Sequence, residues 1–245
     1  FQARGNSPLS NIIGALDGIA IRQERPAATE VTCTKDYWNR KGFFALNVQA
    51  VCDSNYAFTW MSCRTPGSTH DSTALAVSDL GRLLSDRRNP LTMTLIAEGL
   101  CIAADEAYAD REVLAVPWPG GGGGDRWRDG YNFYPAPARI HIEQAFGQLV
   151  WRWGVLWRPL RMPFAKRPLV INAAFLLHNF CRENDAVPLS ALVDAADDRA
   201  RMNLNDSGGP DAPRTRAGQA GSRLRRRMTA AVESAGRVRP PVHRA

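Results

Sequence analysis

The chain has 245 residues, of which 44% are apolar and 22% charged. This ordinary globular composition excludes a collagen-like, coiled-coil or wholly disordered protein. No run of 18 apolar residues occurs, so no transmembrane helix is expected. The formal net charge of +7 comes from the C-terminal part, because residues 199–245 hold 11 arginines and three acids whereas residues 1–198 hold 20 basic and 21 acidic residues.

This division of charge predicts two parts. We expect residues 1–198 to form one α/β domain and residues 199–245 to form a flexible, basic tail rich in arginine, glycine and proline, with the composition for a short helix at residues 224–234. The tail is either an arm that binds phosphate or directs the chain to the nucleus, or a solvated linker without a partner. The chain begins at Phe1 rather than at Met, which indicates a fragment.

Three strands are predicted at the start of the domain. Residues 11–22 form an apolar run with one carboxylate, Asp17, inside it. Residues 43–52 and 56–63 are strands separated by a three-residue turn, the pattern of a hairpin. A helix is predicted at residues 73–84, where Asp71 or Ser72 serves as its cap.

The second half alternates between strand and helix. Residues 100–104 form a short apolar strand that ends at Asp105, and residues 117–137 are predicted as a loop with five successive glycines. The loop has no Gly-Lys-Ser/Thr sequence, so it is not a P-loop. Helices are predicted at residues 138–153 and 169–182. This order predicts a mixed sheet with helices on its faces.

The cysteines indicate a reducing compartment. Their number is five, which is odd, and none forms a Cys-x-x-Cys pair. Neither a disulfide framework nor a structural zinc site fits this pattern, so we expect buried thiols.

Three acids do not fit the usual picture of solvated surface carboxylates. Asp17 lies inside an apolar strand, Asp105 follows one directly, and Glu143 borders the apolar face of its helix. The simpler explanation for Glu143 is an ion pair with Arg139, four residues earlier. Together the three can converge at one sheet edge as an all-oxygen site for Mg²⁺ or Mn²⁺, which suits metal-assisted phosphodiester cleavage.

Seven motifs occur in an order that is typical of one protein family. The sequence resembles the nuclease domain of PIF/Harbinger-type transposases and Harbinger-derived nucleases, a branch of the DDE superfamily, over about residues 10–185. The motifs are Ile-Gly-Ala-Leu-Asp-Gly (13–18), Tyr-Trp-Asn-Arg-Lys-Gly (37–42), Asn-Val-Gln-Ala-Val-Cys-Asp (47–53), Pro-Gly-Ser-Thr-His-Asp-Ser (66–72), Asp-Glu-Ala-Tyr (105–108), Ile-Glu-Gln-Ala-Phe-Gly (142–147) and Leu-Leu-His-Asn-Phe-Cys (176–181).

The resemblance implies a fold and a catalytic set. The fold is RNase H-like, with a five-stranded mixed sheet flanked by helices, and the triad is Asp17, Asp105 and Glu143. Asp71 is a fourth acid of the family, which either adds a metal contact or, with His70, only caps the next helix. The implied reaction is Mg²⁺- or Mn²⁺-dependent DNA strand cleavage followed by strand transfer.

The resemblance also implies partners. These are DNA, a Myb-like DNA-binding protein that can replace the absent N-terminal recognition region, and a second copy of the chain in a homo-oligomer; the expected location is the nucleus. The alternative is a decayed or domesticated copy that binds DNA or protein without turnover. The glycine insert and residues 131–139, which depart from the family pattern, favour that alternative.

Several other motif residues have two readings. Arg40, Lys41, Arg139 and Arg152 either contact phosphate or have ordinary structural and solvated roles. His178 is expected to be a satisfied core histidine. The three tryptophans of the region are expected to pack in the core, with base stacking as the alternative; they are Trp151, Trp153 and Trp157.

Overall fold

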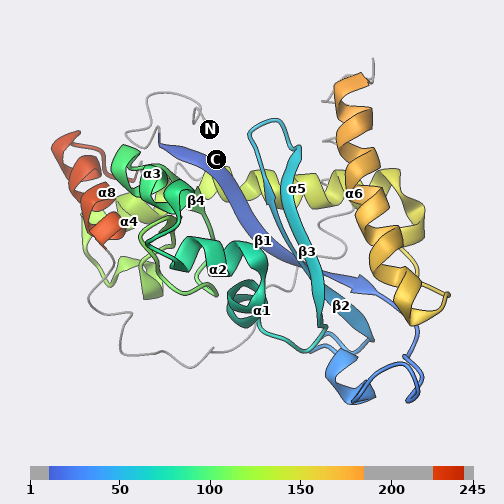
Figure 1. Cartoon of the computed structure of the whole chain (residues 1–245). Coiled ribbons are helices and arrows are strands. Elements are labelled where there is room, and N and C mark those ends of the chain that lie inside the picture. The colour runs from blue at the N-terminus through green and yellow to red at the C-terminus, as the bar shows by residue number, and fades with distance from the viewer. Residues whose placement is uncertain (1–10, 185–222, 240–245) are drawn as a thin grey trace, which may run out of the picture.

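The computed structural model describes residues 11–184 and 223–239 of the chain (Figure 1). Its strands are β1 (Ile12–Arg22), β2 (Ala45–Cys52), β3 (Phe58–Pro66), β4 (Cys101–Ala103) and β5 (Leu114–Ala115). Its α-helices are α1 (Asp71–Val77), α2 (Asp79–Ser85), α3 (Pro90–Glu98), α4 (Arg126–Phe133), α5 (Ala136–Arg152), α6 (Arg167–Asn184) and α8 (Arg223–Ser234). Short 3-10 turns are η1 (Thr34–Tyr37), η2 (Pro119–Gly122), η3 (Gly154–Leu156) and η4 (Phe164–Lys166).

The five strands form one mixed sheet in the order β3-β2-β1-β4-β5. The pairs β1–β2 and β2–β3 are antiparallel, whereas β4 runs parallel to both β1 and β5. Helices flank this sheet, with α5 behind β1 and β2 and with α1 and α2 in front in the view of Figure 1. The predicted class, an α/β fold with a five-stranded mixed sheet flanked by helices, is confirmed and is compatible with an RNase H-like nuclease fold.

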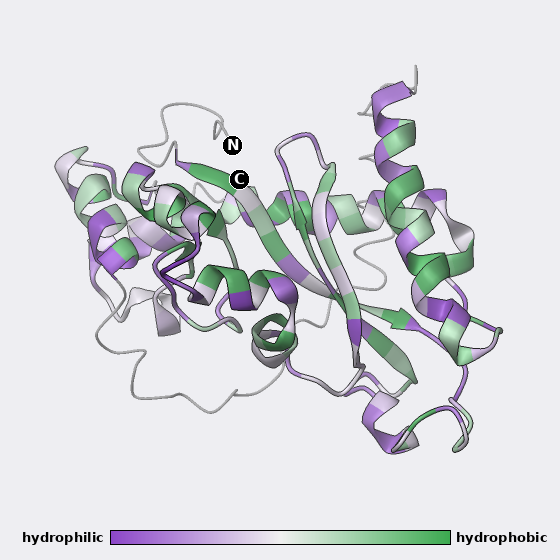
Figure 2. Cartoon of the chain, viewed as in Figure 1, coloured by the Kyte–Doolittle hydropathy of each residue, from purple (hydrophilic) through white to green (hydrophobic). Residues whose placement is uncertain are grey.

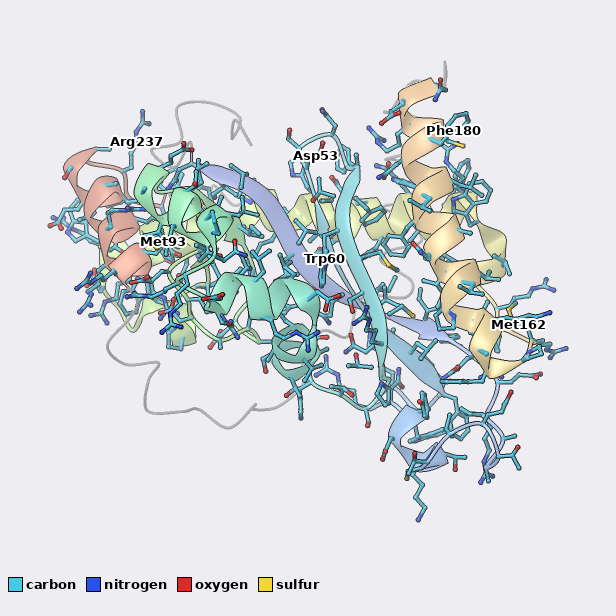
Figure 3. The ribbon with its side chains drawn as sticks, viewed as in Figure 1. Asp53, Trp60, Met93, Met162, Phe180 and Arg237 are labelled. Carbon is cyan, nitrogen blue, oxygen red and sulfur yellow. The ribbon has the colours of Figure 1, made fainter. Side chains whose placement is uncertain are left out.

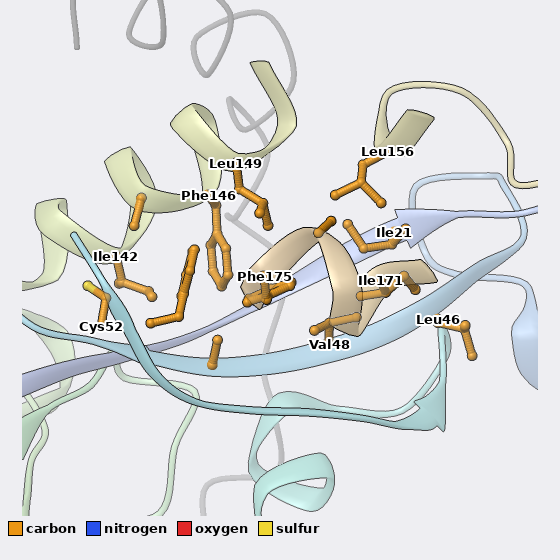
Figure 4. Packing of buried hydrophobic residues seen from close by; sticks show 14 of the residues in the cluster. Ile21, Leu46, Val48, Cys52, Ile142, Phe146, Leu149, Leu156, Ile171 and Phe175 are labelled. Atoms are coloured by element: carbon orange, nitrogen blue, oxygen red, sulfur yellow. The ribbon is translucent and has the colours of Figure 1, made fainter. Parts of the chain in front are cut away.

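Alternate residues of β1 face opposite sides of the sheet, as the two-residue period of a strand requires. Ala15 and Ile21 pack with α5 and α6, whereas Leu16 packs with α1, α2 and α3. Figure 4 shows the first of these cores, in which apolar side chains of α5 and α6 meet β1 and β2. The buried positions of α5 include the predicted set Ile142, Ala145, Phe146 and Leu149, so the periodicity that predicted this helix is confirmed.

Three predictions about elements between the strands are wrong. The helix predicted at residues 73–84 is two helices, because Ser78 ends α1 and its side chain accepts a hydrogen bond from the Gly81 N–H to begin α2. The sequence reading missed α3 and β5. The predicted loop at residues 117–137 contains α4, whose first turn is capped by the Asp125 carboxylate.

Part of the predicted tail is folded. The short helix expected at residues 224–234 forms as α8, which buries Leu224, Met228 and Val232 against β4, α4 and Trp118. Arg225 is 3% exposed and pairs with Asp110 at 3.1 Å. The expectation of flexibility is therefore wrong for residues 223–239, while residues 199–222 and 240–245 lie outside the described ranges.

Several single-residue predictions are also resolved. His178 is fully buried, its Nε2 lies 3.1 Å from the Tyr56 carbonyl oxygen, and burial lowers its pKa to about 4, so it is a core histidine as expected. Its buried Nδ1 has no hydrogen-bond partner among the described residues, so only one of its two ring nitrogens is satisfied. Trp153 packs against the core, but Trp151 and Trp157 are more than one-third exposed, which corrects the core prediction for both. Cys52 and Cys101 are buried, whereas Cys33 is exposed. No helix of the described part of the chain meets the length and apolarity needed for a membrane span.

Candidate active site

Asp17 lies in the middle of β1, opposite Ala50 of β2. Its position two residues from both Ala15 and Ile19 places it on the face of the sheet that packs against α5. The carboxylate is half-buried, and its Oδ1 accepts a hydrogen bond of 2.7 Å from the Gly18 N–H. A partly desolvated carboxylate inside a strand needs such polar partners, or a cation, to offset the cost of burial.

Asp105 follows β4 directly after Ala104, and β4 is the parallel neighbour of β1. Its Oδ1 accepts a hydrogen bond of 2.9 Å from the Ala107 N–H, so the turn after the strand fixes the carboxylate. The side chain is half-buried. Since β1 and β4 are adjacent, the chain brings residues 17 and 105 to neighbouring positions of the sheet, as the sequence predicted.

Glu143 comes from α5, the helix that packs across β1. Its neighbour Ile142 is buried in the core beneath the helix, whereas Glu143 itself is exposed. The predicted ion pair with Arg139 does not form in the described structure, where no salt bridge joins the two side chains within 4.0 Å. The charge of Arg139 nevertheless acts on Glu143, whose pKa it lowers, so the simpler explanation keeps a weaker electrostatic form.

The three acids influence one another's ionisation. Burial raises the pKa of Asp17 well above its usual range, and the negative charges of Asp105, Asp71 and Glu143 raise it further, against the opposing hydrogen bond from Gly18. Burial is also the main cause of the raised pKa of Asp105 and of Glu143. The charges of these acids therefore act on one another, and a cation among them would lessen the repulsion.

Arg139 supplies a positive charge to this group. Its guanidinium lowers the pKa of both Asp105 and Glu143, against the stronger effect of burial. The Arg139 Nε is buried and makes no hydrogen bond within the described residues. A buried guanidinium nitrogen without an acceptor is costly, so this position suits an added anionic oxygen.

Asp71 lies on the other face of β1. It is the first residue of α1, and its Oδ1 accepts hydrogen bonds from the side-chain amides of Asn47, at 2.9 Å, and Gln49, at 2.8 Å. His70 occupies the N-cap position but makes no capping hydrogen bond with its side chain, so helix capping does not explain this pair. The charge of Asp71 still reaches Asp17 and Asp105, whose pKa values it raises.

Gly18 makes this arrangement fit. A Cβ atom built at Gly18 would lie 2.4 Å from both Asp71 Oδ1 and Gln49 Nε2, closer than any real contact of this kind. The structure identifies the groups that approach, because the amide of Gln49 and the carboxylate of Asp71 close over the backbone of β1.

Sequence reasoning missed a hydrogen-bond network behind the acids. The Tyr108 hydroxyl donates to Gln49 Oε1 at 2.5 Å, and Gln49 Nε2 donates in turn to Asn47 Oδ1 and Asp71 Oδ1. Burial raises the pKa of Tyr108, and so do the charges of Asp17, Asp71 and Asp105, which keeps the phenol protonated as a donor. Asn47, Gln49 and Tyr108 lie within the motifs at 47–53 and 105–108. Those motifs were the sequence signal that could have indicated the network.

The donor set fits a hard divalent cation, since it consists of carboxylate oxygens with no cysteine or histidine beside them. The side chains do not yet form a closed coordination shell: over residues 11–184 and 223–239, no three His, Cys, Asp or Glu residues lie close enough together to hold a metal ion. The residue types therefore fit a hard divalent cation, but their arrangement in the described structure is not a complete metal site.

One comparison with known proteins gave a match. The family model described as DDE superfamily endonuclease matches residues 16–179, a range that begins just before Asp17 and includes Asp105 and Glu143. No curated protein and no solved structure matches the chain.

Proposed function

The chain belongs to the DDE superfamily of endonucleases, and from this membership we propose that it is a divalent-metal-dependent DNA endonuclease of the PIF/Harbinger transposase type. We assign catalysis to Asp17, Asp105 and Glu143. The observation that supports the proposal is that β1, the end of β4 and α5, which are neighbours in the fold, carry these three acids, and that the charges of Asp105 and Glu143 add to burial in raising the pKa of Asp17.

The proposed cofactor is Mg²⁺ or Mn²⁺, held by Asp17, Asp105 and Glu143. The all-oxygen donor set and the repulsion between its members support this choice. When bound, the cation would neutralise the developing charge on phosphate and activate a nucleophilic oxygen. Asp71 is proposed to add its negative charge to the electrostatic potential at the cation. Its hydrogen bonds to the amides of Asn47 and Gln49 favour a role in positioning neighbouring side chains.

The chain's own residues prepare this chemistry in several ways. The Gly18 N–H orients the Asp17 carboxylate, and the Ala107 N–H orients that of Asp105. The network of Tyr108, Gln49 and Asn47 holds Asp71 against the backbone of β1. We propose that Arg139 binds a phosphate oxygen of the substrate, since its buried Nε needs an acceptor. The proposed reaction is cleavage of a DNA strand to leave a 3′-hydroxyl, followed by attack of that hydroxyl on a second DNA.

The test is nicking of supercoiled plasmid in the presence of Mn²⁺. We expect the wild-type chain to convert plasmid to the open circular form and Glu143→Gln to lose this activity by at least about 100-fold, since a metal-binding carboxylate becomes a neutral amide of the same shape. Glu98→Gln removes an exposed acid at the end of α3 and is the matched control, with activity expected to equal wild type. Nicking that persists undiminished in Glu143→Gln would contradict the assignment.

A second candidate is a decayed or domesticated copy that binds DNA or protein without turnover. The observation in its favour is that no three acids of the described residues are close enough to hold a metal as they stand. This candidate predicts plasmid binding without nicking, whether the wild-type chain or Glu143→Gln is used. The same assay therefore separates the two.

The proposal extends to surroundings and partners. A DNA substrate and the 11 arginines of residues 199–245 support residence in the nucleus. We also propose that a separate DNA-binding protein, of Myb-like type, supplies sequence recognition. In this scheme residues 1–198 form the nuclease domain, α8 packs on it, and exposed arginines such as Arg223 and Arg226 add contacts to phosphate.

A further inference from the structure

Helix α6 has two apolar faces, and only one of them is covered. The inner face packs against β3 and α5 through Ile171, Ala174, Phe175 and His178. On the opposite face Leu169, Leu176 and Phe180 are 66%, 64% and 62% exposed, and Ala173 between them is exposed as well. Figure 2 shows hydrophobic residues along the length of α6, and Figure 3 labels Phe180 towards the end of the helix that projects from the molecule.

The exposed residues follow the spacing of a helix–helix contact. Positions 169, 173, 176 and 180 are separated by four, three and four residues, which keeps them on one side of a helix that packs against another helix. Lys166, the last residue of η4 and three residues before this run, and Glu183 of α6, three residues after it, are exposed at each end of the run. We call these six positions, from 166 to 183, the α6 stripe.

Other exposed apolar side chains lack this order. Leu91 and Met93 are exposed on α3, but they stand two positions apart and point to different sides of the helix. Single exposed apolar residues of that kind are normal on protein surfaces. A continuous stripe at heptad spacing with a charge at each end is the pattern of an interface.

The α6 stripe is complementary to itself when it is reversed. In an antiparallel pair of α6 helices, Leu169 of one copy lies opposite Phe180 of the other, Ala173 lies opposite Leu176, and Lys166 lies opposite Glu183. The small Ala173 leaves room for a large residue, and the two ends form ion pairs of opposite charge. In a parallel pair, Lys166 of one copy would instead lie opposite Lys166 of the other, and Glu183 opposite Glu183. Like charges would then repel at both ends.

We propose that the α6 stripe binds the same stripe of a second copy of this chain, in an antiparallel two-fold contact. From 167 to 183 α6 spans about 24 Å, at 1.5 Å per residue. A contact of one helix pair is smaller than an obligate interface, so the dimer exchanges with monomer as the concentration changes. The pairing is independent of metal binding and of the assignment of the catalytic acids.

Sedimentation velocity of the full chain over a range of concentrations tests the pairing. The wild-type chain should pass from monomer to dimer as concentration rises, whereas Leu176→Glu, which places a charge in the middle of the α6 stripe, should remain monomeric. Leu91→Glu alters a residue that is 54% exposed on α3 and should dimerise like wild type. Circular dichroism establishes that the variants keep their helices, as expected for changes at exposed positions.

Charge reversal tests the antiparallel register. Lys166→Glu and Glu183→Lys should each raise the dissociation constant of the dimer about tenfold or more, because each places like charges opposite one another at both ends. The double variant restores opposite charges and should return the constant to within about threefold of wild type. A wild-type chain that is monomeric at every concentration, as when another segment or another protein covers α6, would overturn the proposal. So would a double variant as weak as the single ones.

Discussion

Gly18 contributes to the site because it has no side chain. The space that a Cβ would fill is occupied by the Asp71 carboxylate and the Gln49 amide, and both belong to the network that ends at Tyr108. Gly18, beside the proposed catalytic acid Asp17, thus leaves room on the opposite face of the strand for the Asp71 carboxylate and the Gln49 amide. The same strand position could not carry the site with an ordinary side chain.

Gly18→Ala should therefore separate Asp71 from Gln49 and shift β1. We expect nicking to fall by about tenfold or more, with a loss of only about 1 kcal/mol in the free energy of unfolding, since the displaced atoms are side-chain ends. Gly154→Ala is the control, because a Cβ at Gly154 meets open space and should change neither quantity. Plasmid nicking and urea unfolding measure the two effects. Full activity in Gly18→Ala would contradict the role given to the network.

At the scale of elements, the helices were predictable where their apolar period is strong and their ends are marked by sequence. In α5 the buried residues recur with the helical period, and in α6 a proline marks the first turn. The break between α1 and α2 could not be predicted in this way, because it depends on the Ser78 hydroxyl bonding to the backbone within an otherwise helical pattern. In α4 only Gly130 and Tyr131 are buried, so no apolar periodicity in the sequence indicated this helix.

Helix α8 shows how a charged segment can still join the core. Three apolar residues lie beneath it, and Arg225 turns inward to Asp110, in the loop that follows Asp105. Arg227 donates a hydrogen bond to the Gly99 carbonyl oxygen at 3.1 Å. The composition of the region, rich in arginine and glycine, indicated a solvated tail because it does not reveal which arginines point inward.

Arg225→Met should weaken the docking of α8. Removing one partner of a buried ion pair leaves the Asp110 carboxylate uncompensated, at a cost of about 3–5 kcal/mol. Hydrogen exchange should show lost protection in α8 and in the loop that carries Asp110, with β1 and β2 unchanged. Arg226→Met, at an exposed position of the same helix, should leave the exchange pattern as in wild type. Unchanged protection of α8 in Arg225→Met would show that the ion pair does not hold the helix.

At the scale of the whole molecule, the sequence predicted the sheet and three acids of the site but not the contacts between distant segments. The strand around Asp17 and the strand before Asp105 could be predicted because each is a short apolar run. The two acids stood out because a carboxylate is costly to bury in or beside such a run. The bond from Tyr108 to Gln49 spans 59 residues, and no local pattern encodes it. The packing of α8 joins residues more than 100 positions apart, as in the contact of Trp118 with Thr229.

The arrangement of acids also predicts a conflict between stability and function. Because the pKa values of Asp17, Asp105 and Glu143 are raised in the folded chain, the ionised carboxylates destabilise the metal-free protein near neutral pH, and this cost is relieved as the pH falls through the raised pKa values. A bound divalent cation relieves the same cost at neutral pH. It must compete with protons, so its affinity falls on acidification.

Thermal unfolding of wild type and Asp17→Asn, with and without Mn²⁺ at neutral pH, is the most direct test of a cation site formed by these acids. Without metal, Asp17→Asn should melt a few degrees above wild type, because a buried charge is removed. Addition of Mn²⁺ should raise the melting temperature of wild type and of Glu98→Gln but not of Asp17→Asn. A melting temperature of wild type that Mn²⁺ leaves unchanged, or raises equally in Asp17→Asn, would contradict the site.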